Sequence, residues 1–324
     1  MRKATVVIPN YNGIKYMANC LESLYRLKEQ ALFQVLVVDN GSTDGSMELI
    51  RDNYPQAELI SLPENTGFCH AVNVGIEKAD TPYIILLNND TEVLPGFVEA
   101  LIDAIECDEK CFAVSSQMLQ WQNHSLIDDA GDQYCVLGWA YSRGKGKPAD
   151  QYDRPTEVFA ACGGASIYRK SILNEIGYFD EAHFAYLEDI DISYRARIYG
   201  YHCTYEPTAK VLHAGSATSG SRYNNFKTGL SSANSTYLIC KNMPLLQLVW
   251  NLPFLILGFL IKTIFFTIKE MGTTYLKGLC KGLQKAHTQE GKTHKVPFQW
   301  SRLGNYIHIQ FLLYMNTFRL FLKK

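Results

Sequence analysis

Ile84-Ile85-Leu86-Leu87-Asn88-Asn89-Asp90 is the stretch that decides the fold, because four apolar residues end abruptly in two amides and one carboxylate. A short apolar run bounded by turn residues is typical of a strand buried on both faces. Open α/β sheets bind ligands outside the carboxyl ends of such strands, where Asn88-Asn89-Asp90 would lie. A carboxylate among amides there suits a divalent cation that holds a diphosphate. Taken alone, the triplet fits a plain Asn/Asp turn better, so the surrounding sequence has to decide.

Strands and helices alternate four times in the first 90 residues. This alternation predicts an α/β fold with a parallel, doubly wound sheet and right-handed crossovers. The chain has no Gly-x-Gly-x-x-Gly after the first expected strand and no Gly-x-x-x-x-Gly-Lys, which argues against dinucleotide oxidoreductases and P-loop enzymes. The expected strands are Thr5–Pro9, Phe33–Val38, Glu58–Leu62 and the strand that runs into Asn88.

The alternating pattern weakens in the polar, aromatic and Gly-containing segment Leu119–Glu157. A long irregular excursion inside a compact domain is usually functional or disordered. Beyond this segment we expect a strand over Phe159–Ala161 and Ala165–Tyr168, around Gly163-Gly164. A helix over Glu188–Tyr199 and a closing strand over Cys203–Glu206 should follow. His213 would lie in the loop after that strand.

Charge is unevenly distributed along the chain, although the net charge is only -1. Lys269–Lys324 carries ten Lys and Arg against two Asp and Glu, a net of +8, whereas the preceding residues carry a net of -9. A basic tail on an acidic body favours an anionic surface as partner, and on charge alone a membrane and a nucleic acid are equally good candidates.

The nine Cys are scattered and include no Cys-x-x-Cys pair, which predicts free thiols in a reducing compartment rather than disulfides or a zinc site. Met1-Arg2-Lys3-Ala4 leads directly into a strand without a signal-peptide apolar region. We therefore expect the catalytic part to stay in the cytosol.

Leu245–Ile268 is an apolar stretch long enough to span a membrane, which takes about 20 residues. Polar residues, a proline and a lysine interrupt it, and a single span would export the basic tail against the positive-inside rule. We prefer an in-plane segment or a helical hairpin, with the basic tail on anionic lipid. The alternative is a core helix of a soluble C-terminal subdomain. The interrupting residues are Gln247, Asn251, Pro253 and Lys262.

Eight motifs, in order between Thr5 and about Ser221, resemble glycosyltransferase family 2, the inverting nucleotide-sugar transferases of the GT-A fold. The detail is similar to the rhamnosyltransferase-like branch that acts on bacterial surface polysaccharides. The matching motifs are Val7-Ile8-Pro9-Asn10-Tyr11-Asn12, Val38-Asp39-Asn40-Gly41-Ser42-Thr43-Asp44-Gly45, Asn65-Thr66-Gly67-Phe68 with Asn73, Asn88-Asn89-Asp90, Gly163-Gly164-Ala165, Gly177-Tyr178-Phe179-Asp180-Glu181, Glu188-Asp189-Ile190-Asp191 with Arg195, and His213 with Gly215–Ser221.

The resemblance implies a donor site that holds a nucleoside-diphosphate sugar, dTDP- or UDP-linked, with Mn²⁺ or Mg²⁺. Asp90 would bind the metal, and His213 would contact the metal or the diphosphate; an imidazole ligand favours Mn²⁺. Asp189 would be the catalytic base, with Glu188 as its competitor or an acceptor contact. The remaining donor contacts implied are Pro9, Tyr11, Asp39, Asn73, Asn88 and Asn89.

The same residues also admit plain structural interpretations. Asp39 serves equally well as a turn residue that caps the next helix. Acidic residues such as Glu188 and Asp189 stabilise a helix start by about 0.3–1 kcal/mol each, and Asp191 is assigned to a pair with Arg195, four residues on. Trp139, Tyr141 and Tyr186 are candidates to stack on sugar rings, although buried aromatics more often fill a core.

Two departures from the family pattern affect these assignments. Asn88 stands where the family often has Asp, so only one carboxylate remains at the strand end. Ala233-Asn234 stands where relatives commonly carry Arg-Asn, so a contact is expected to be missing there.

We therefore predict a GT-A domain over residues 1–225 and a helical, membrane-associating region over residues 226–324, peripheral on the inner face of the cell membrane. The function predicted is transfer of a sugar, with rhamnose as the candidate, to a lipid-linked or growing cell-surface saccharide; nucleic acid is not an expected partner. A nucleotidyltransferase is disfavoured because the loop Asn10–Gly13 carries no Arg or Lys. The non-enzymatic alternative is a nucleotide-sugar-binding scaffold of a polysaccharide assembly complex.

Overall fold

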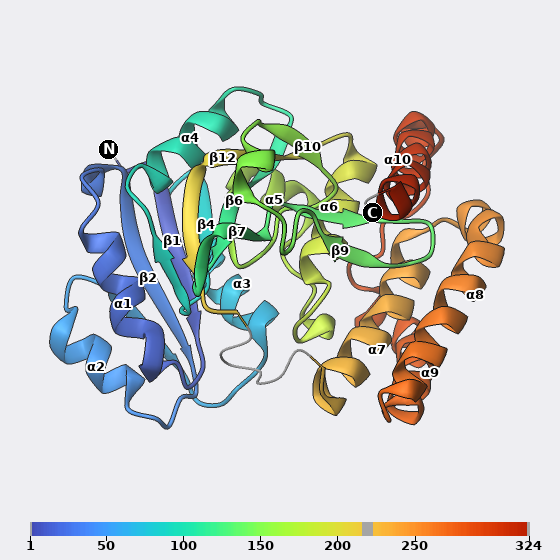
Figure 1. Ribbon diagram of the computed structural model, residues 1–324, viewed down its shortest axis with the longest axis horizontal. Helices are drawn as coiled ribbons and strands as arrows, with labels where there is room; N and C mark the ends of the chain where they lie inside the picture. The colour runs from blue at the N-terminus through green and yellow to red at the C-terminus, as the bar shows by residue number, and fades with distance from the viewer. Residues whose placement is uncertain (1, 216–222, 323–324) are drawn as a thin grey trace.

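The computed structural model describes residues 2–215 and 223–322, and its centre is a mixed ten-stranded sheet (Figure 1). The strand order along the main path is β10-β12-β6-β11-β4-β1-β2-β3, while β5 pairs with β12 and β7 with β6. The strands are β1 Ala4–Asn10, β2 Phe33–Asn40, β3 Glu58–Leu62, β4 Tyr83–Leu87, β5 Thr91–Val93, β6 Cys111–Gln120, β7 Asn123–Asp129, β10 Thr156–Val158, β11 Ala165–Arg169 and β12 His202–His213.

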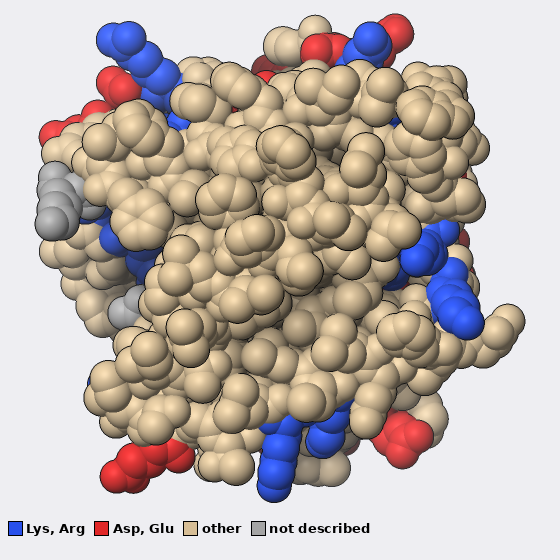
Figure 2. Space-filling view, turned by 90° about the vertical axis from the view of Figure 1, so that its right-hand side faces the viewer, with Lys and Arg blue, Asp and Glu red and all other residues tan. Residues whose placement is uncertain are grey.

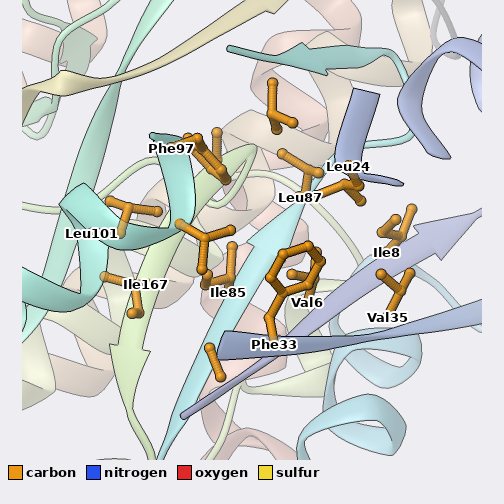
Figure 3. Close-up of a cluster of buried hydrophobic side chains, with 14 of the residues drawn as sticks. Val6, Ile8, Leu24, Phe33, Val35, Ile85, Leu87, Phe97, Leu101 and Ile167 are labelled. Carbon is orange, nitrogen blue, oxygen red and sulfur yellow. The ribbon is translucent and has the colours of Figure 1, made fainter. Parts of the chain in front are cut away.

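The first four strands form the predicted parallel sheet, because β1 pairs in parallel with both β2 and β4, and β2 with β3. The connecting helices are α1 Ile14–Tyr25, α2 Ser46–Asn53 and α3 Phe68–Lys78. Side chains of β1, β2 and β4 pack on one face against α1 and against α4, Phe97–Glu106, as Figure 3 shows for Leu24, Leu87 and Phe97. The alternation of strands and helices was therefore a sound guide to this part of the fold.

The sheet becomes mixed beyond β4, since β11 runs antiparallel to both β4 and β6, whereas β12 is parallel to β6. β12 is longer than the predicted closing strand Cys203–Glu206, and its register shifts between Glu206 and Lys210. Pro207 lies in that interval, and a proline has no N–H to donate to the ladder. The extension brings His213 opposite Thr91 of β5, directly beside Asp90.

The irregular segment Leu119–Glu157 is ordered. It contains the end of β6, β7, the hairpin β8–β9 and the short 3₁₀ helix Ala149–Tyr152. The hairpin strands β8 Asp132–Tyr134 and β9 Ala140–Ser142 form a separate two-stranded sheet. The backbone N–H groups of Phe159 and Ala160 donate to the Asp132 carbonyl, so the expected strand at Phe159–Ala161 is instead a connection between β10 and β11.

The C-terminal helices pack together on one side of the sheet domain, next to α6, Glu188–Tyr199 (right of Figure 1). The closest approach is between α7 and α9, where a Cβ added to Gly278 would lie 1.8 Å from Ser232 Oγ. α8 is one helix that continues through Pro253 rather than a helical hairpin. The bounds of the remaining helices are α5 Lys170–Ile176, α7 Asn225–Asn242, α8 Leu245–Ile268, α9 Gly272–His287 and α10 Leu303–Leu322. The other short 3₁₀ helices are Gln30–Leu32, Glu181–His183, Glu290–Lys292 and Trp300–Arg302.

Candidate active site

A cavity of about 1160 Å³ lies where β1, β2 and β4 end. Its lining brings together side chains from distant parts of the sequence, because the carboxyl ends of neighbouring parallel strands meet at one edge of the sheet. The predicted site residues that line it are Pro9, Tyr11, Asn88, Asn89, Asp90, Glu188, Asp189 and His213.

Asp39 and Asn73 do not line this cavity. The Asp39 carboxylate is fully buried and accepts hydrogen bonds from Asn10 Nδ2 at 2.7 Å and from the Ser42 backbone N–H at 2.9 Å. The Asn73 side chain donates to the Phe179 carbonyl at 2.8 Å and accepts from the Phe179 N–H at 3.0 Å. Asp39 therefore braces the turn after β2 but does not cap α2, whose first N–H, that of Ser46, donates to Asp44 instead. Asn73 braces the turn after α5.

Asp39 still acts on the cavity wall through Asn10. The Asn10 side chain donates to Asp39 and accepts from Asn89 Nδ2 at 2.8 Å, so the ends of β1, β2 and β4 are joined by side-chain hydrogen bonds. Asn89 is thereby held against β1, whereas Asn88, which is half-buried, lies beside Gly164.

One end of the cavity is formed by Asp90 and His213, with Asp128 behind the His213 ring. His213 lies between the two carboxylates, with Nε2 3.4 Å from Asp90 Oδ1 and Nδ1 2.8 Å from Asp128 Oδ2. Burial acts to lower the pKa of His213, but hydrogen bonds to Asp128 and Asp90 outweigh it and raise the pKa to about 9. Lys145 pairs with Asp128 at 2.7 Å. Burial opposes ionisation of Asp128, yet its bonds to His213 and Lys145 lower its pKa to about 2.

This end has the donor set of a small divalent-metal site. A carboxylate oxygen and an imidazole nitrogen are acceptable ligands for Mn²⁺. Asp128 on Nδ1 would fix the ring so that Nε2 faces Asp90, which is the usual arrangement of an outer carboxylate behind a ligating histidine. The residues present therefore fit a metal ion held by Asp90 and His213.

Three carboxyl groups form another end of the cavity, at the start of α6. Burial raises the pKa of Glu188 to about 8, and the neighbouring Asp189 charge adds to this effect. Burial also raises the pKa of Asp189, against the hydrogen bond of 2.7 Å that its Oδ1 accepts from the Ile190 N–H. Asp132 of β8 is hydrogen-bonded to Asp189, and burial raises the pKa of Asp132 well above its usual range.

Sequence reasoning missed Asp128, Asp132 and Lys145, all of which lie in Leu119–Glu157. Their segment has no strand or helix periodicity from which a facing direction follows. The closely spaced carboxylates in Asp128-Asp129-Ala130-Gly131-Asp132 were the available signal, inside a segment already expected to be functional or disordered.

The aromatic candidates divide between the cavity and the C-terminal helices. Tyr141 and Tyr186 line the cavity. Tyr141 also donates from its hydroxyl to the Asn316 carbonyl at 2.7 Å. Trp139 does not line the cavity, because its Nε1–H donates to the Gly258 carbonyl of α8 at 3.1 Å.

The predicted pair of Asp191 and Arg195 is confirmed, with Nε 3.2 Å from Oδ2 and both side chains fully buried. Of the last predicted motif, residues 216–221 lie outside the described part of the chain.

Comparison with known sequences gives one family and several relatives. Residues 5–177 match the family described as Glycosyl transferase family 2. The N-acetylglucosaminyl-diphospho-decaprenol L-rhamnosyltransferase of Mycobacterium tuberculosis (strain CDC 1551 / Oshkosh) is 30% identical over 231 residues, which cover 64% of this chain and 75% of that protein. The poly-beta-1,6-N-acetyl-D-glucosamine synthase of Staphylococcus aureus (strain COL) is 26% identical over 208 residues, which cover 63% of this chain and 48% of that protein.

Two solved structures share the fold. GalNAc-T7 with UDP, GalNAc and Mn²⁺ superposes with a TM-score of 0.61 at 16% identity, covering 74% of this chain and 48% of that one. The mannosyltransferase PcManGT from Pyrobaculum calidifontis, in complex with GDP-Man and Mn²⁺, superposes with a TM-score of 0.56 at 15% identity, covering 87% of this chain and 88% of that one.

Proposed function

The chain belongs to glycosyltransferase family 2 and has the GT-A fold, and we propose that it inverts the anomeric centre as it transfers a sugar to a lipid-linked or growing cell-surface saccharide. The observation that carries this proposal is the division of one cavity into a metal-type end at Asp90 and His213 and a carboxyl end at Glu188, Asp189 and Asp132. A donor diphosphate suits the former, and an acceptor hydroxyl suits the latter.

Asp189 is the proposed base. As the acceptor oxygen bonds to the anomeric carbon and the bond from that carbon to the diphosphate breaks, Asp189 takes the hydroxyl proton. General-base assistance of this kind is typically worth about 10²–10⁴-fold. Glu188 is a poorer choice, because a pKa of about 8 favours its protonated form at neutral pH, and a protonated carboxyl group does not accept a proton. Asp132 orients the Asp189 carboxylate through their hydrogen bond.

The metal proposed is Mn²⁺ or Mg²⁺, held by Asp90 and His213. Its chemistry there is to neutralise the charge that develops on the departing nucleoside diphosphate. The two structural neighbours, both solved with Mn²⁺, support this choice. Asp90 is then the one carboxylate of the strand-end triplet, and Asp128 keeps the His213 ring in the ligating orientation.

The donor proposed is a dTDP- or UDP-linked sugar, with rhamnose as the candidate. The named activity of the mycobacterial relative supports rhamnose. The choice of nucleotide rests on the family resemblance, since one structural neighbour is solved with UDP and the other with GDP-Man. Pro9 and Tyr11 line the cavity where β1 ends, together with Asn40 and Asn65. The Tyr11 ring, 37% exposed, is the side chain that we propose stacks on the base.

Membrane association is proposed through a surface that we call the platform, made by the exposed apolar side chains of α8 and α10. Figure 2 shows the side on which these helices lie, almost without charge at its centre and with Lys, Arg, Asp and Glu at its margins. α8 is long and apolar enough to cross a membrane. Only 17% of its most apolar 18-residue stretch is buried, whereas a core helix of a soluble protein is mostly buried. The most exposed platform residues are Leu245, Leu246, Val249, Trp250, Ile256, Ile264, Ile268, Ile307, Phe311, Phe318, Phe321 and Leu322.

The polar residues of α8 lie on its inner side, which favours an in-plane helix over a span. Gln247 accepts from the Tyr194 hydroxyl of α6 at 3.0 Å, and Asn251 donates to Gln310 of α10 at 2.9 Å. A Cβ on Gly258 would lie 2.2 Å from the Leu137 carbonyl, so this side of α8 touches the β8–β9 hairpin. A helix held along the catalytic domain in this way presents only its other side to lipid.

The platform is tested by sedimentation with vesicles. The double variant Trp250→Ser, Phe311→Ser should remain soluble while losing most of its binding to anionic vesicles at low salt. Neutral vesicles measure the purely apolar contribution. If the wild-type protein sediments with neither kind of vesicle, the platform does not bind membranes and this proposal is wrong.

A panel of nucleotide sugars with Mn²⁺, scored by nucleoside diphosphate release, tests the activity. Release that depends on a saccharide or lipid-linked acceptor is the expected result. Tight donor binding without release or transfer, for every donor and acceptor, would instead identify the chain as a nucleotide-sugar-binding scaffold.

A further inference from the structure

The backbone immediately before Glu188 has an unusual conformation. Phe184, Tyr186 and Leu187 carry side chains yet have φ of 61°, 71° and 66°. This conformation is unfavourable for residues with a Cβ and persists only where the surroundings impose it. The same segment, residues 184–187, lines the cavity and leads directly into the carboxyl end of the site. Something outside this loop must therefore hold it.

Asn234 of α7 is the side chain that does so. Its Nδ2 lies 2.8 Å from the His183 carbonyl, 2.9 Å from the Ala185 carbonyl and 2.9 Å from the Tyr186 carbonyl. An amide nitrogen has two hydrogens, so three acceptors share them. Asn234 is fully buried, and solvent therefore does not compete for these carbonyls.

Helix α7 is itself anchored on both sides of the loop. The Lys241 ammonium lies 2.6 Å from Asp180 Oδ2, before the loop, and 2.7 Å from Asp191 Oδ1, after it. Asn242 Nδ2 also donates to Asp191 at 2.7 Å. All of these groups are buried, so the ion pairs are screened little by solvent. Asn234 is thus carried by a helix whose position relative to α6 is fixed by these contacts.

We propose that Asn234 is a positioning residue, which holds the carbonyls of residues 183–186 so that the strained loop delivers Glu188 and Asp189 to the cavity. What the two acids do there rests on the proposed function, but the restraint on the loop does not. Asn234 touches no cavity-side atom of the carboxyl groups and acts only through the backbone that precedes them.

The test compares substitutions of Asn234 with Asn316→Ala. Asn316 is also a buried asparagine on a C-terminal helix, but its Nδ2 donates to a single carbonyl, that of Tyr134, at 3.0 Å. All variants are assayed well below their melting temperatures. Hydrogen–deuterium exchange of residues 183–190 and the kcat and donor KM of transfer are measured for each.

In Asn234→Ala, exchange in residues 183–190 should accelerate, and kcat should fall about ten-fold or more while donor KM changes less than about three-fold. Asn316→Ala should leave both kcat and exchange in this segment near wild type. Asn234→Asp should be worse than Asn234→Ala, because it keeps the shape but turns a carboxylate oxygen toward three carbonyl oxygens. A side chain that merely fills space would show the opposite order.

Unchanged exchange of residues 183–190 in Asn234→Ala, or an Asn234→Asp variant at least as active as Asn234→Ala, would overturn the proposal. If neither variant is obtained folded, Asn234→Ser, which keeps one donor, takes their place, and its exchange must lie above that of wild type. Wild-type protein without transfer for any donor would remove the proposed function, while the exchange measurement would still decide the role of Asn234.

Discussion

The carboxyl groups at the two ends of the cavity differ in whether they have cationic partners. At the metal-type end, His213 lies between Asp90 and Asp128, and Lys145 pairs with Asp128, so each carboxylate has a cationic partner. At the carboxyl end, no ion pair among the described residues involves Glu188, Asp189 or Asp132. Both ends are largely buried, so the difference comes from partners rather than from exposure.

The consequence is a fixed charge at one end and exchangeable protons at the other. Without a metal, partners lower the pKa of Asp128 to about 2 and raise that of His213 to about 9, so both are ionised around neutral pH. A metal ion bound at Nε2 would displace the imidazolium proton, because only the neutral ring has a lone pair to offer. Burial without a cation raises the pKa of Glu188 to about 8, and raises those of Asp189 and Asp132. Fixed charge suits an ionic ligand, and a raised carboxyl pKa suits proton transfer.

Substitution of Asp189 should have the largest effect. Asp189→Asn preserves shape and removes basicity, so turnover should fall about 10²–10⁴-fold. Donor and metal affinity, measured by titration with the nucleoside diphosphate and Mn²⁺, should stay within a few-fold, because the lost interaction is confined to the transition state. The matched variant is Glu188→Gln, one residue away. Near-normal turnover in Asp189→Asn together with an inactive Glu188→Gln would transfer the role of base to Glu188.

Substitution at the metal-type end should show the reverse pattern. Asp90→Ala should remove the metal dependence of donor binding while leaving the fold intact, and should cost about 100-fold or more in turnover, since a metal ion supplies several kcal/mol of charge stabilisation. Chelation of wild-type protein should reproduce this loss. Full activity in excess chelator would contradict both the metal and its assignment to Asp90.

A smaller effect at the same end is expected from Asp128, which orients the His213 ring without facing the metal. Asp128→Asn should lower Mn²⁺ affinity about 10–100-fold, the usual cost of losing a carboxylate behind a ligating histidine. Lys145→Ala, which removes the other partner of Asp128 but leaves the ring bonded, is the comparison and should cost less. Equal losses in the two variants would point to overall charge rather than ring orientation.

At the metal-type end, Asp90 was indicated by strand geometry, because it follows a buried apolar run. His213 was assigned only through its place in the order of family motifs, and the extension of β12 that puts it opposite Thr91 was not predicted. Asp128 was not predicted as a site residue, because its strand, β7, starts in an irregular segment with no repeating pattern. Asn73 was assigned to the nucleotide from its place in a motif, whereas its side chain is hydrogen-bonded to Phe179 and Glu181, residues far away in the sequence.

The carboxyl end depends more on tertiary contacts. Helix-start acids at Glu188 and Asp189 were visible in the sequence, but the loop conformation that precedes them is imposed by Asn234, some 45 residues later. The substitution of Ala for Arg at position 233 suggested a lost contact, while the retained Asn234 makes three. Likewise, the polar residues that interrupt the apolar run of α8 face inward, which no periodicity of a single helix can reveal without its neighbours.

The smallest effect, and the finest test of the comparison, concerns the pH profile. Burial raises the pKa of Asp132 well above its usual range and so favours its protonated form, and its hydrogen bond to Asp189 favours the ionised form of the base. Asp132→Ala removes that bond, so the pKa of Asp189 should rise further. A base works only when deprotonated, and activity is therefore lost as pH falls through its pKa. The acid limb of kcat should thus move to higher pH by about one unit, with little change above it.

Asp132→Asn is the matched control, because its amide still donates to Asp189, and its acid limb should stay close to that of wild type. Equal shifts in the two variants would show that the hydrogen bond is not the controlling contact. A shift of the acid limb of Asp132→Ala toward lower pH would mean that Asp132 is ionised in the working enzyme and repels the Asp189 carboxylate. The carboxyl end would then carry a fixed charge, as the metal-type end does. Measuring the full pH profile of kcat for the three proteins separates these outcomes, since each moves the limb in a different direction or leaves it in place.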